Sequence, residues 1–453
     1  MQPHINPDDV VGCKWVYKLK ERENGQTCRY KARLLAKGFS QIKGVNYDET
    51  YSPVLSFKSL RALFAYAAQQ DLDIYHVDIE TAFLHGDLSD VVYMRQPEGF
   101  VSSDQKGKVC LLKKPLYGLK QGSREWNKKL KNKLVNDIKM KQSVYDNCIF
   151  YIREGSKVIF VATWVDDILF FTNCADLFNM VKNKLSESFP IKFLGEVKRF
   201  LGISVHRNKS KGIIQLEQSD YIRNVLKNYG MEECNPVASP METGTIFHAN
   251  MLPDDNSQTD IKNQNVPYQS AIGSLMYLLQ ATRPDLAYSI STLSKFNNCH
   301  QSKHWTAVKR VLRYLKGTCD LCLTFSKSAS SNLTGYCDAS WVPDPSDPRS
   351  ITGYVFTLQG AALCWNTKRQ STTALSSTEA EYMSLSAATQ EAIWLRGFTI
   401  ELGIIQDRSV TIFCDNKGAI ELGKNARFSS RTKHINPKHH FIKELIESGK
   451  IDV

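Results

Sequence analysis

The stretch Phe160-Val-Ala-Thr-Trp-Val-Asp-Asp-Ile-Leu-Phe-Phe171 is almost wholly apolar on both sides of the pair Asp166-Asp167. Its β-branched and aromatic residues are typical of two buried strands. Successive residues of a flat strand point to opposite faces, so only a tight hairpin turn at the pair would bring both carboxylates to one tip. Ionised carboxylates in an apolar setting are costly unless they are paired, and a divalent cation is a common partner. A solvated hairpin turn, for which aspartate is also well suited, is an equal alternative from this stretch alone.

The composition is that of a folded, basic protein. A chain of 453 residues is too long for one hydrophobic core and predicts about two to four domains. The 58 basic and 46 acidic residues give a formal charge of +12, which favours polyanion partners and nucleic acid first. No apolar run of about 18 residues occurs, so neither a transmembrane helix nor a membrane partner is expected. The N-terminal residues lack the basic and apolar regions of a secretion signal.

The twelve cysteines are scattered singly along the chain. The only close pair, Cys319 and Cys322, has no second pair and no histidine partner at zinc-site spacing. Reduced thiols in a cytosolic or nuclear compartment are therefore expected.

A basic β-hairpin is predicted near the N-terminus. The alternating stretches Lys14–Lys20 and Cys28–Lys37 flank the turn signal Glu23-Asn-Gly25. Three cations of the second strand share one face, namely Arg29, Lys31 and Arg33. Such a ribbon can bind phosphate groups, although a solvated strand face explains the same pattern equally well.

A third acid lies far from the Asp166-Asp167 pair in sequence. The apolar stretch Ile74-Tyr-His-Val-Asp-Ile-Glu-Thr-Ala-Phe-Leu84 contains Asp78 within a predicted strand. Three carboxylates on apolar strands, with a basic ribbon upstream, suggest a two-metal site for phosphoryl transfer. One metal ion would lower the pKa of an attacking hydroxyl, and the other would stabilise the leaving pyrophosphate.

Five motifs, in this order and at these separations, resemble those of copia-type (Pseudoviridae) retrotransposon reverse transcriptases. They are Arg29-Tyr-Lys-Ala-Arg-Leu-Leu-Ala-Lys-Gly-Phe-Ser-Gln41, Val77-Asp-Ile-Glu-Thr-Ala-Phe-Leu-His-Gly86, Leu116-Tyr-Gly-Leu-Lys-Gln121, Val165-Asp-Asp-Ile-Leu169 and Phe200-Leu-Gly-Ile-Ser204. The resemblance runs from about Gly12 to the C-terminus. The chain therefore looks like a fragment of a Pol polyprotein, or a degraded or standalone copy of one.

The resemblance implies an α+β multidomain protein. A right-hand polymerase with fingers, a ferredoxin-like palm and a thumb would precede an α/β ribonuclease H-like domain. The fingers and palm would occupy residues 1–204, the thumb and a linker 205–265, a helical connection 266–329, and the ribonuclease H-like domain 330–453.

The resemblance also assigns roles to single residues of the polymerase. Asp78, Asp166 and Asp167 match its catalytic, metal-binding aspartates. The basic ribbon carries Arg29, and its Lys31 and Arg33 match cations that bind the triphosphate. The remaining matches are Phe83 with the aromatic gate against a ribose 2′-hydroxyl, Gln121 with a template-nucleotide contact, and Leu201-Gly202 with the primer grip.

Two departures from the family pattern lie near these residues. Trp164 stands where the family usually has tyrosine, and its larger ring could crowd the primer terminus. Phe193 stands where the family usually has aspartate. Neither change removes a predicted metal ligand.

Further along, Leu216–Tyr229 has apolar residues at helical spacing and fits either a thumb helix or a core helix. The polar segment 239–266 is typical of a linker. A later helix would bury Trp305, Val308, Leu312 and Leu315. Its opposite side carries Lys309, Arg313 and Lys316, with Lys303 and Arg310 nearby, and is either a solvated face or a track for the primer–template backbone.

A second set of acids matches the strand, helix, strand order of the ribonuclease H fold. Asp338 lies in a predicted strand, Glu379 near the start of a helix, and Asp415 at the end of an apolar strand. The resemblance implies that these three hold a second pair of metal ions and cut RNA in an RNA–DNA hybrid. The alternative for Glu379 is that it only completes a capping box with Ser376.

One further departure concerns this second site. Asn436 follows Lys433-His-Ile435, where the family usually has aspartate. Asparagine followed by proline can still begin a helix, but the fourth carboxylate is lost. The hypothesis is that ribonuclease H activity is reduced, or depends on the nearby His434 or His439.

The predicted function is an RNA-directed DNA polymerase with an attached ribonuclease H. Each site would use two Mg²⁺ ions, with Mn²⁺ as an alternative. The expected partners are an RNA template, a DNA primer–template, an RNA–DNA hybrid and deoxynucleoside triphosphates, in the cytoplasm (a virus-like particle) or the nucleus. The oligomeric state stays open. The rival hypothesis is a non-catalytic nucleic-acid-binding remnant.

Overall fold

The computed structural model describes residues 6, 9–20, 29–101, 107–242, 244–245, 247, 266–344, 347–405, 408–424 and 436–453. Most of the predicted linker and the segment Arg431–Ile435 lie outside these residues. The chain forms two compact units. The first comprises Met1–Leu55 and Asp73–Glu196, and the second comprises Ser56–Leu72 and Val197–Val453. The four domain ranges expected from the sequence stay predictions.

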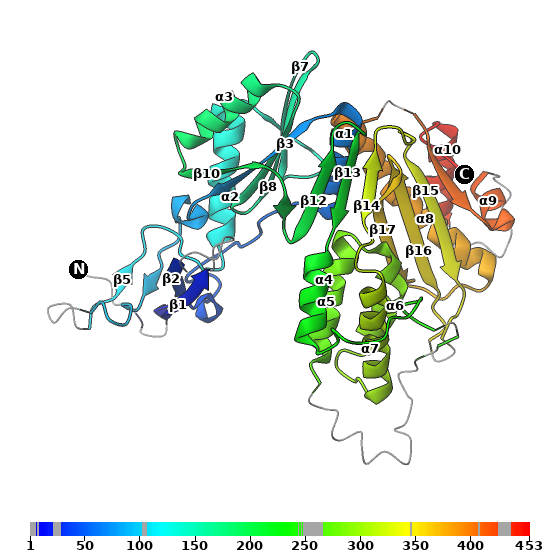
Figure 1. Cartoon of the computed structure of the whole chain (residues 1–453), viewed down its shortest axis with the longest axis horizontal. Helices are drawn as coiled ribbons and strands as arrows, with labels where there is room; N and C mark the ends of the chain where they lie inside the picture. Colours follow the sequence, from blue (N-terminus) through cyan, green and yellow to red (C-terminus); the bar gives the residue numbers. More distant parts are fainter. Residues whose placement is uncertain are drawn as a thin grey trace. The chain divides into compact units, whose positions relative to one another are not determined.

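A six-stranded antiparallel sheet forms the centre of the first unit (Figure 1), in the order β10-β3-β9-β8-β7-β6. The strands are β3 (Asp73–Ile79), β6 (Lys141–Gln142), β7 (Ile149–Glu154), β8 (Lys157–Trp164), β9 (Asp167–Thr172) and β10 (Ile191–Glu196). Helix α2 (Gly122–Asn132) lies between β3 and β8 in sequence, and helix α3 (Ala175–Ser186) lies between β9 and β10. This βαββαβ order is the ferredoxin-like arrangement predicted for the palm.

Both helices pack on one face of this sheet. Trp126 and Leu130 of α2 share a buried cluster with Phe178 and Val181 of α3. Alternate residues of the strands complete the cluster, including Val77, Ile79, Ile159, Val161, Ile168 and Phe170. Because β8 and β9 are apolar on both faces, nearly all of their side chains are buried, as their composition predicts.

The basic ribbon forms as predicted, from β1 (Cys13–Lys20) and β2 (Arg29–Ala36). Lys18 pairs with Lys31, and Val16 pairs with Arg33. A short pair of strands, β4 (Tyr93–Met94) and β5 (Cys110–Leu111), completes the described strands of the first unit.

The second unit begins with a segment taken from early in the chain. Helix α1 (Phe57–Gln70) contacts β13 (Ile213–Glu217) and β14 (Leu323–Ser326) of a four-stranded sheet. The other strands of that sheet are β11 (Arg199–Phe200) and β12 (Ile203–Asn208), and the order is β11-β12-β13-β14.

Arg61 fixes helix α1 inside the second unit. Its guanidinium is fully buried and donates to the carbonyl oxygens of Leu363, Gln280 and Ala281 at 2.7, 2.7 and 2.8 Å. It also lies 3.9 Å from the ring centroid of Trp365. Burial lowers the pKa of Arg61 to about 9.

Four helices share one core in this unit, namely α4 (Ser219–Asn228), α5 (Tyr268–Ala281), α6 (Ala287–Ser294) and α7 (Ser302–Gly317). The predicted apolar stripe of α7 is confirmed, because Val308, Leu312 and Leu315 are buried and Trp305 is packed against the core.

The basic side of α7 is partly occupied by the chain itself. Arg310 pairs with Glu242 at 2.6 Å, and Arg313 donates to the carbonyl of Asn235 at 2.7 Å. Lys316 donates to the carbonyl of Glu232. Three of the cations therefore have partners within the chain itself, and a track for nucleic acid is not needed to explain their presence.

A five-stranded mixed sheet follows, in the order β17-β16-β15-β18-β19. Strands β15 (Thr334–Ser340), β16 (Ile351–Leu358) and β17 (Ala361–Arg369) are antiparallel, whereas β18 (Val410–Cys414) runs parallel to β15 and to β19 (Ile451–Asp452). Helix α8 (Ser377–Glu401) covers one face of this sheet (Figure 1), and α9 (Lys417–Lys424) and α10 (Asn436–Glu447) follow. Within the described ranges, no helix is both long and apolar enough to cross a membrane.

Candidate active sites

The Asp166-Asp167 pair lies at the closed end of a tight hairpin. Trp164 and Asp167 are the last paired residues of β8 and β9, so the turn consists of Val165 and Asp166. Val165 has a φ of 56°, the left-handed conformation that such a two-residue turn requires. Trp126 Nε1 donates to the carbonyl of Val165 at 2.6 Å and supports the turn from the core. The predicted hairpin is thus confirmed.

The structure brings the three predicted polymerase acids together. Asp78 on β3 pairs directly with Asp167 on β9, and the Ile79 N–H donates to the carbonyl of Asp166 at 2.8 Å. Burial raises the pKa of Asp78 above its usual value, and the charges of Asp166 and Asp167 raise it further. Burial also raises the pKa of Asp166, with Asp167 adding to the effect. The three carboxyl groups therefore repel one another across a small space.

Two cations of the basic ribbon oppose this repulsion. Burial raises the pKa of Asp166, but the positive charges of Arg33 and Lys31 act to lower it. The Arg33 guanidinium also lies 5.9 Å from the centroid of the Tyr117 ring. The charges of the ribbon therefore act on the acids. The side chain of Arg29 lies outside the described residues.

Phe83 lies close to the same acids. It follows β3 in a short 3-10 turn, Ala82–His85, and its ring centroid is 4.7 Å from that of Tyr117. Burial raises the pKa of Tyr117, and the charge of Asp166 contributes. Tyr117 lies in the motif Leu116-Tyr-Gly-Leu-Lys-Gln121, but the sequence alone indicated no role for it.

His76 is a residue of this site that sequence reasoning missed. Its Nε2 lies 2.9 Å from Oδ1 of Asp167. The signal was present in the sequence, because His76 precedes Asp78 by two positions and therefore shares its strand face. The contact fixes the orientation of one Asp167 oxygen.

The second set of acids meets at the β15–β18 pair. Cys337 of β15 pairs with Cys414 of β18, so Asp338 and Asp415 each follow a paired residue. On helix α8, Glu381 places a carboxylate oxygen within 4.8 Å of both the Cys414 sulfur and an Asp415 oxygen. Burial raises the pKa of Glu381 to about 7, and the charges of Asp338, Cys414 and Asp415 add to this.

Glu379 occupies a different position from the one expected. Its carboxylate accepts from the Leu375 N–H at 2.7 Å, and its own N–H donates to Ser376 Oγ at 3.2 Å. Residues two apart on a helix point about 200° apart, so Glu379 and Glu381 cannot face the same strand end. The capping alternative describes Glu379, and the helix carboxylate beside Asp415 belongs to Glu381.

Comparison with known proteins bears on what these sites do. The sequence profile of the family described as reverse transcriptase (RNA-dependent DNA polymerase) matches residues 5–243. This chain belongs to the reverse transcriptase family. The resemblance inferred from the five motifs is therefore confirmed for the polymerase part.

Several related sequences come from retrotransposons. A retrovirus-related Pol polyprotein from transposon TNT 1-94 of Nicotiana tabacum is 40% identical over 442 residues, which cover 97% of this chain and 33% of the relative. The corresponding polyprotein from transposon RE2 of Arabidopsis thaliana is 38% identical, covering 98% of this chain and 30% of the relative. The chain thus spans about a third of these polyproteins. A putative transposon Ty5-1 protein of Saccharomyces cerevisiae is 31% identical, covering 70% of this chain and 100% of the relative.

A solved structure of the foamy viral protease–reverse transcriptase in complex with double-stranded DNA has a TM-score of 0.21 and 13% sequence identity. It covers 96% of this chain and 65% of that one. This similarity is too low to support an argument about fold or function.

Gln121 of this reverse transcriptase is not placed to contact a template base. Its side chain is fully buried, accepts from Gln41 Nε2 at 3.0 Å, and donates to the Asn46 carbonyl and Asp90 Oδ2 at 2.9 and 3.0 Å. These bonds use the amide to hold three separate segments together. The structure therefore gives Gln121 a structural role in place of the predicted contact.

The predicted primer grip belongs to the second unit. Leu201 and Gly202 form the turn between β11 and β12, with φ angles of 49° and 71°. The Tyr277 hydroxyl donates to the Leu201 carbonyl. A side chain at position 202 would require a disfavoured backbone conformation, so glycine suits this turn.

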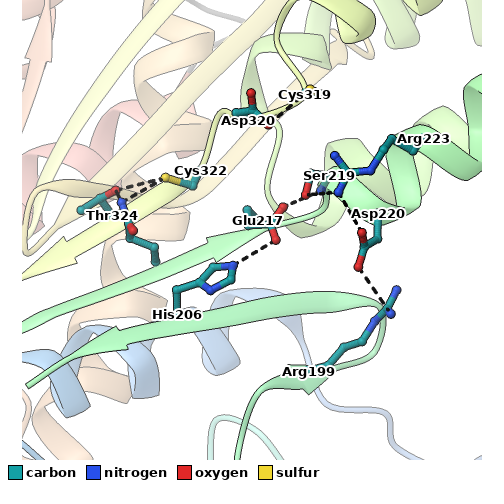
Figure 2. Close-up of polar contacts among 11 residues, drawn as sticks. Arg199, His206, Glu217, Ser219, Asp220, Arg223, Cys319, Asp320, Cys322 and Thr324 are labelled. Atoms are coloured by element: carbon teal, nitrogen blue, oxygen red, sulfur yellow. Dashed lines mark hydrogen bonds and ion pairs between the residues drawn. The ribbon is translucent and has the colours of Figure 1, made fainter. Parts of the chain in front are cut away.

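A polar network lies near this turn, where β13 leads into α4 (Figure 2). Glu217 contacts His206 Nε2 at 3.1 Å and accepts from the Ser219 N–H at 2.6 Å. Asp220 pairs with Arg223 at 2.9 Å and with Arg199 at 3.7 Å. Burial acts to raise the pKa of Glu217, but the hydrogen bonds from Ser219 and His206 outweigh it and lower the pKa to about 2.

The hypothesis about Asn436 stays a prediction. Helix α10 begins at Asn436, in agreement with the expected helix start, but the side chains of residues 436–439 lie outside the description. His434 lies in the undescribed segment before the helix.

Proposed function

We propose that this chain extends a primer 3′-hydroxyl with deoxynucleotides on an RNA or DNA template. The observation that carries this proposal is the meeting of Asp78, Asp166 and Asp167 at the end of one sheet, with cations of the basic ribbon beside them. Membership of the reverse transcriptase family supports the reaction type.

Two divalent cations, Mg²⁺ or alternatively Mn²⁺, fit the three carboxylates. The pKa values of Asp78 and Asp166 are raised, first by burial and further by neighbouring carboxylates, and oxygen ligands are those that Mg²⁺ prefers. Such ions would lower the pKa of the primer hydroxyl and neutralise the leaving pyrophosphate. Asp78, Asp166 and Asp167 would hold them, and His76 would keep one oxygen of Asp167 in position.

Other residues of the first unit would bind the incoming nucleotide. Lys31 and Arg33, whose charges act on Asp166, would hold the triphosphate. Phe83, which packs against Tyr117, would lie against the sugar and exclude a 2′-hydroxyl. The primer contact expected for Leu201-Gly202, which belongs to the second unit, stays part of the proposal.

A ribonuclease H activity is the second part of the proposal. Asp338, Glu381 and Asp415 would bind a second pair of Mg²⁺ ions and direct cleavage of RNA in an RNA–DNA hybrid. The mixed five-stranded sheet with acids at its central strands supports this assignment. Here Glu381 takes the role that the sequence reading gave to Glu379.

The retrotransposon relatives suggest the biological setting. This chain would act as part of a Pol polyprotein in the cytoplasm or the nucleus, copying element RNA into DNA.

Primer extension tests the polymerase proposal. Purified chain would receive a primed RNA template, Mg²⁺ and deoxynucleotides, and extension is expected. Asp166→Asn should abolish extension and leave hybrid cleavage intact, because the two acid sets are separate. The control Asp137→Asn changes an exposed carboxylate of the same unit and should retain extension. Absence of extension with retained hybrid binding would overturn the proposal and favour a non-catalytic nucleic-acid-binding remnant.

A further inference from the structure

A thiol lies among the acids of the second site. The sulfur of Cys414, a carboxylate oxygen of Glu381 and one of Asp415 all lie within 4.8 Å of one another. Glu381 is only 7% exposed, and its Oε2 is buried without a hydrogen-bond partner. A buried, unpartnered carboxylate oxygen is costly unless a ligand satisfies it. Within the described residues, no other set of three histidine, cysteine or acidic side chains converges this closely.

We infer that Glu381, Cys414 and Asp415 form a binding site for a thiophilic divalent cation of the zinc and cadmium class. Zinc binds thiolate at about 2.3 Å and carboxylate oxygen at about 2.0–2.2 Å in tetrahedral geometry, so two ligand atoms of one ion lie roughly 3.4–3.7 Å apart. The three ligand atoms lie within 4.8 Å of one another, so each pair must close by no more than roughly 1.4 Å to share one ion. Magnesium prefers oxygen ligands only, so the thiol selects a different metal from the one proposed for hybrid cleavage.

The surroundings of Cys414 suit a metal-binding thiolate. Cys337, on the neighbouring strand, pairs with Cys414, so the two side chains lie on the same face of the sheet. Glu381 is buried, Cys414 is half-buried and Asp415 is exposed, so a cation can approach from the side of Asp415. On binding, the Cys414 thiol releases its proton to solvent and its sulfur bonds to the metal. No electron is transferred.

The inference has a consequence that rests on the proposed ribonuclease H function. A thiophilic cation bound by Glu381 and Asp415 occupies two of the groups that hybrid cleavage needs. Zinc should therefore inhibit hybrid cleavage in the presence of Mg²⁺. The binding itself requires no catalytic activity and can be measured separately.

Cadmium titration of the whole chain, free of Mg²⁺, tests the site. The readout is the ultraviolet charge-transfer absorption of a cadmium–thiolate bond, which oxygen ligands do not give. Cys414→Ser should remove one equivalent of this absorption, and Glu381→Gln should weaken cadmium binding at least about tenfold. The matched control Cys322→Ser, which alters a half-buried thiol that contacts Thr324, should leave this equivalent unchanged.

Two results would overturn the inference. One is a Cys414→Ser variant that keeps the full absorption; the other is a Glu381→Gln variant with unchanged affinity, which would place cadmium on an isolated thiol. If either variant fails to fold, alkylation of wild-type chain decides. Cadmium should then protect Cys414 from iodoacetamide, as read by mass spectrometry, and lack of protection would refute the site. Cadmium binding without any hybrid cleavage in Mg²⁺ would preserve the inference and refute the ribonuclease H proposal.

Discussion

Glu379 and Glu381 show that the position of a residue on a helix decides which site its side chain can reach. The motif Ser376–Tyr382 contains both glutamates, and Glu379 has the spacing of a capping box with Ser376. Helix α8 packs against the sheet through Ala380, Ser384 and Leu385, among others, and Glu381 lies on that side. The sequence does not show where β15 lies relative to the helix. It therefore cannot indicate which of the two carboxylates lies beside Asp415.

Substitution of each glutamate tests the choice. Glu381→Gln should lower hybrid cleavage at least about tenfold, because it removes a charged oxygen beside Asp415. Glu379→Gln is the matched control and should change cleavage little, while it weakens the helix start. The measurement is the rate of RNA cleavage in a labelled hybrid. Equal loss in both variants, or greater loss in Glu379→Gln, would contradict the assignment.

The raised pKa of Asp78 has a consequence for stability. A carboxyl whose folded pKa exceeds its unfolded value stabilises the fold below the unfolded pKa, and this contribution is lost as pH rises through the folded pKa. Without divalent cation, ionisation of Asp78 as pH rises therefore costs stability. We expect Asp78→Asn to raise the melting temperature by about 2–4 °C.

Mg²⁺ should reverse this difference, because it stabilises the wild-type carboxylates more than those of the variant. Calorimetry with and without Mg²⁺ gives the measurement, and Asp137→Asn serves as the control. A melting temperature that falls in Asp78→Asn without Mg²⁺ would show that the carboxylate is stabilising.

At the scale of elements, the sequence predicted the strands better than it predicted the contacts of polar side chains. The hairpin β8–β9 and the ribbon β1–β2 followed from alternation and apolar composition, which act locally. The partners of polar side chains come from distant segments. Gln121 is held by Gln41, 80 positions away, and Arg313 of α7 by Asn235, 78 positions away. No local pattern in the sequence reports such contacts.

Helix α1 depends on one buried cation. Arg61→Met should destabilise the second unit by about 3 kcal/mol or more, because three buried carbonyl oxygens lose their donors. Lys58→Met is the comparison, since Lys58 pairs with Glu391 at a partly exposed position and should cost about 1 kcal/mol or less. Urea unfolding measures both. Similar values for the two variants would show that Arg61 does not anchor the helix.

The start of helix α4 should show acid sensitivity. Hydrogen bonds lower the pKa of Glu217 to about 2 against the burial that opposes them. Such a carboxylate stabilises the fold above its unfolded pKa of about 4.5, and the contribution is lost as pH falls toward 2. Glu217→Gln should therefore be less stable than wild type at pH 7, with a difference that shrinks below pH 4.5. A difference independent of pH would contradict this account.

At the scale of the whole molecule, the two units predict two unfolding transitions. Asp78→Asn should shift only the transition of the first unit, and Arg61→Met only that of the second. Differential scanning calorimetry of the full chain distinguishes the transitions. A single transition that moves with both variants would show that the units unfold together.

The sequence predicted a ferredoxin-like palm, and the strand order β10-β3-β9-β8 agrees with this expectation, whereas the α/β ribonuclease H-like domain stays a prediction. The assignment of α1 to the second unit was not predicted. The helix directly precedes β3, and its contacts with residues far along the chain, among them Gln280 and Leu363, reveal where it belongs. From sequence order, α1 would be expected to pack beside β3. The residues that bury Arg61, however, lie far along the chain.

This connectivity has a cost during synthesis. Arg61 binds the carbonyl of a residue 302 positions later, so the ribosome must add that many residues before the anchor of α1 exists. At about 5–20 residues per second, this takes roughly 15–60 s. Throughout that interval the apolar side of α1 lacks its final partners. Helix α1 of the nascent chain is therefore expected to need protection from aggregation until Leu363 has been added.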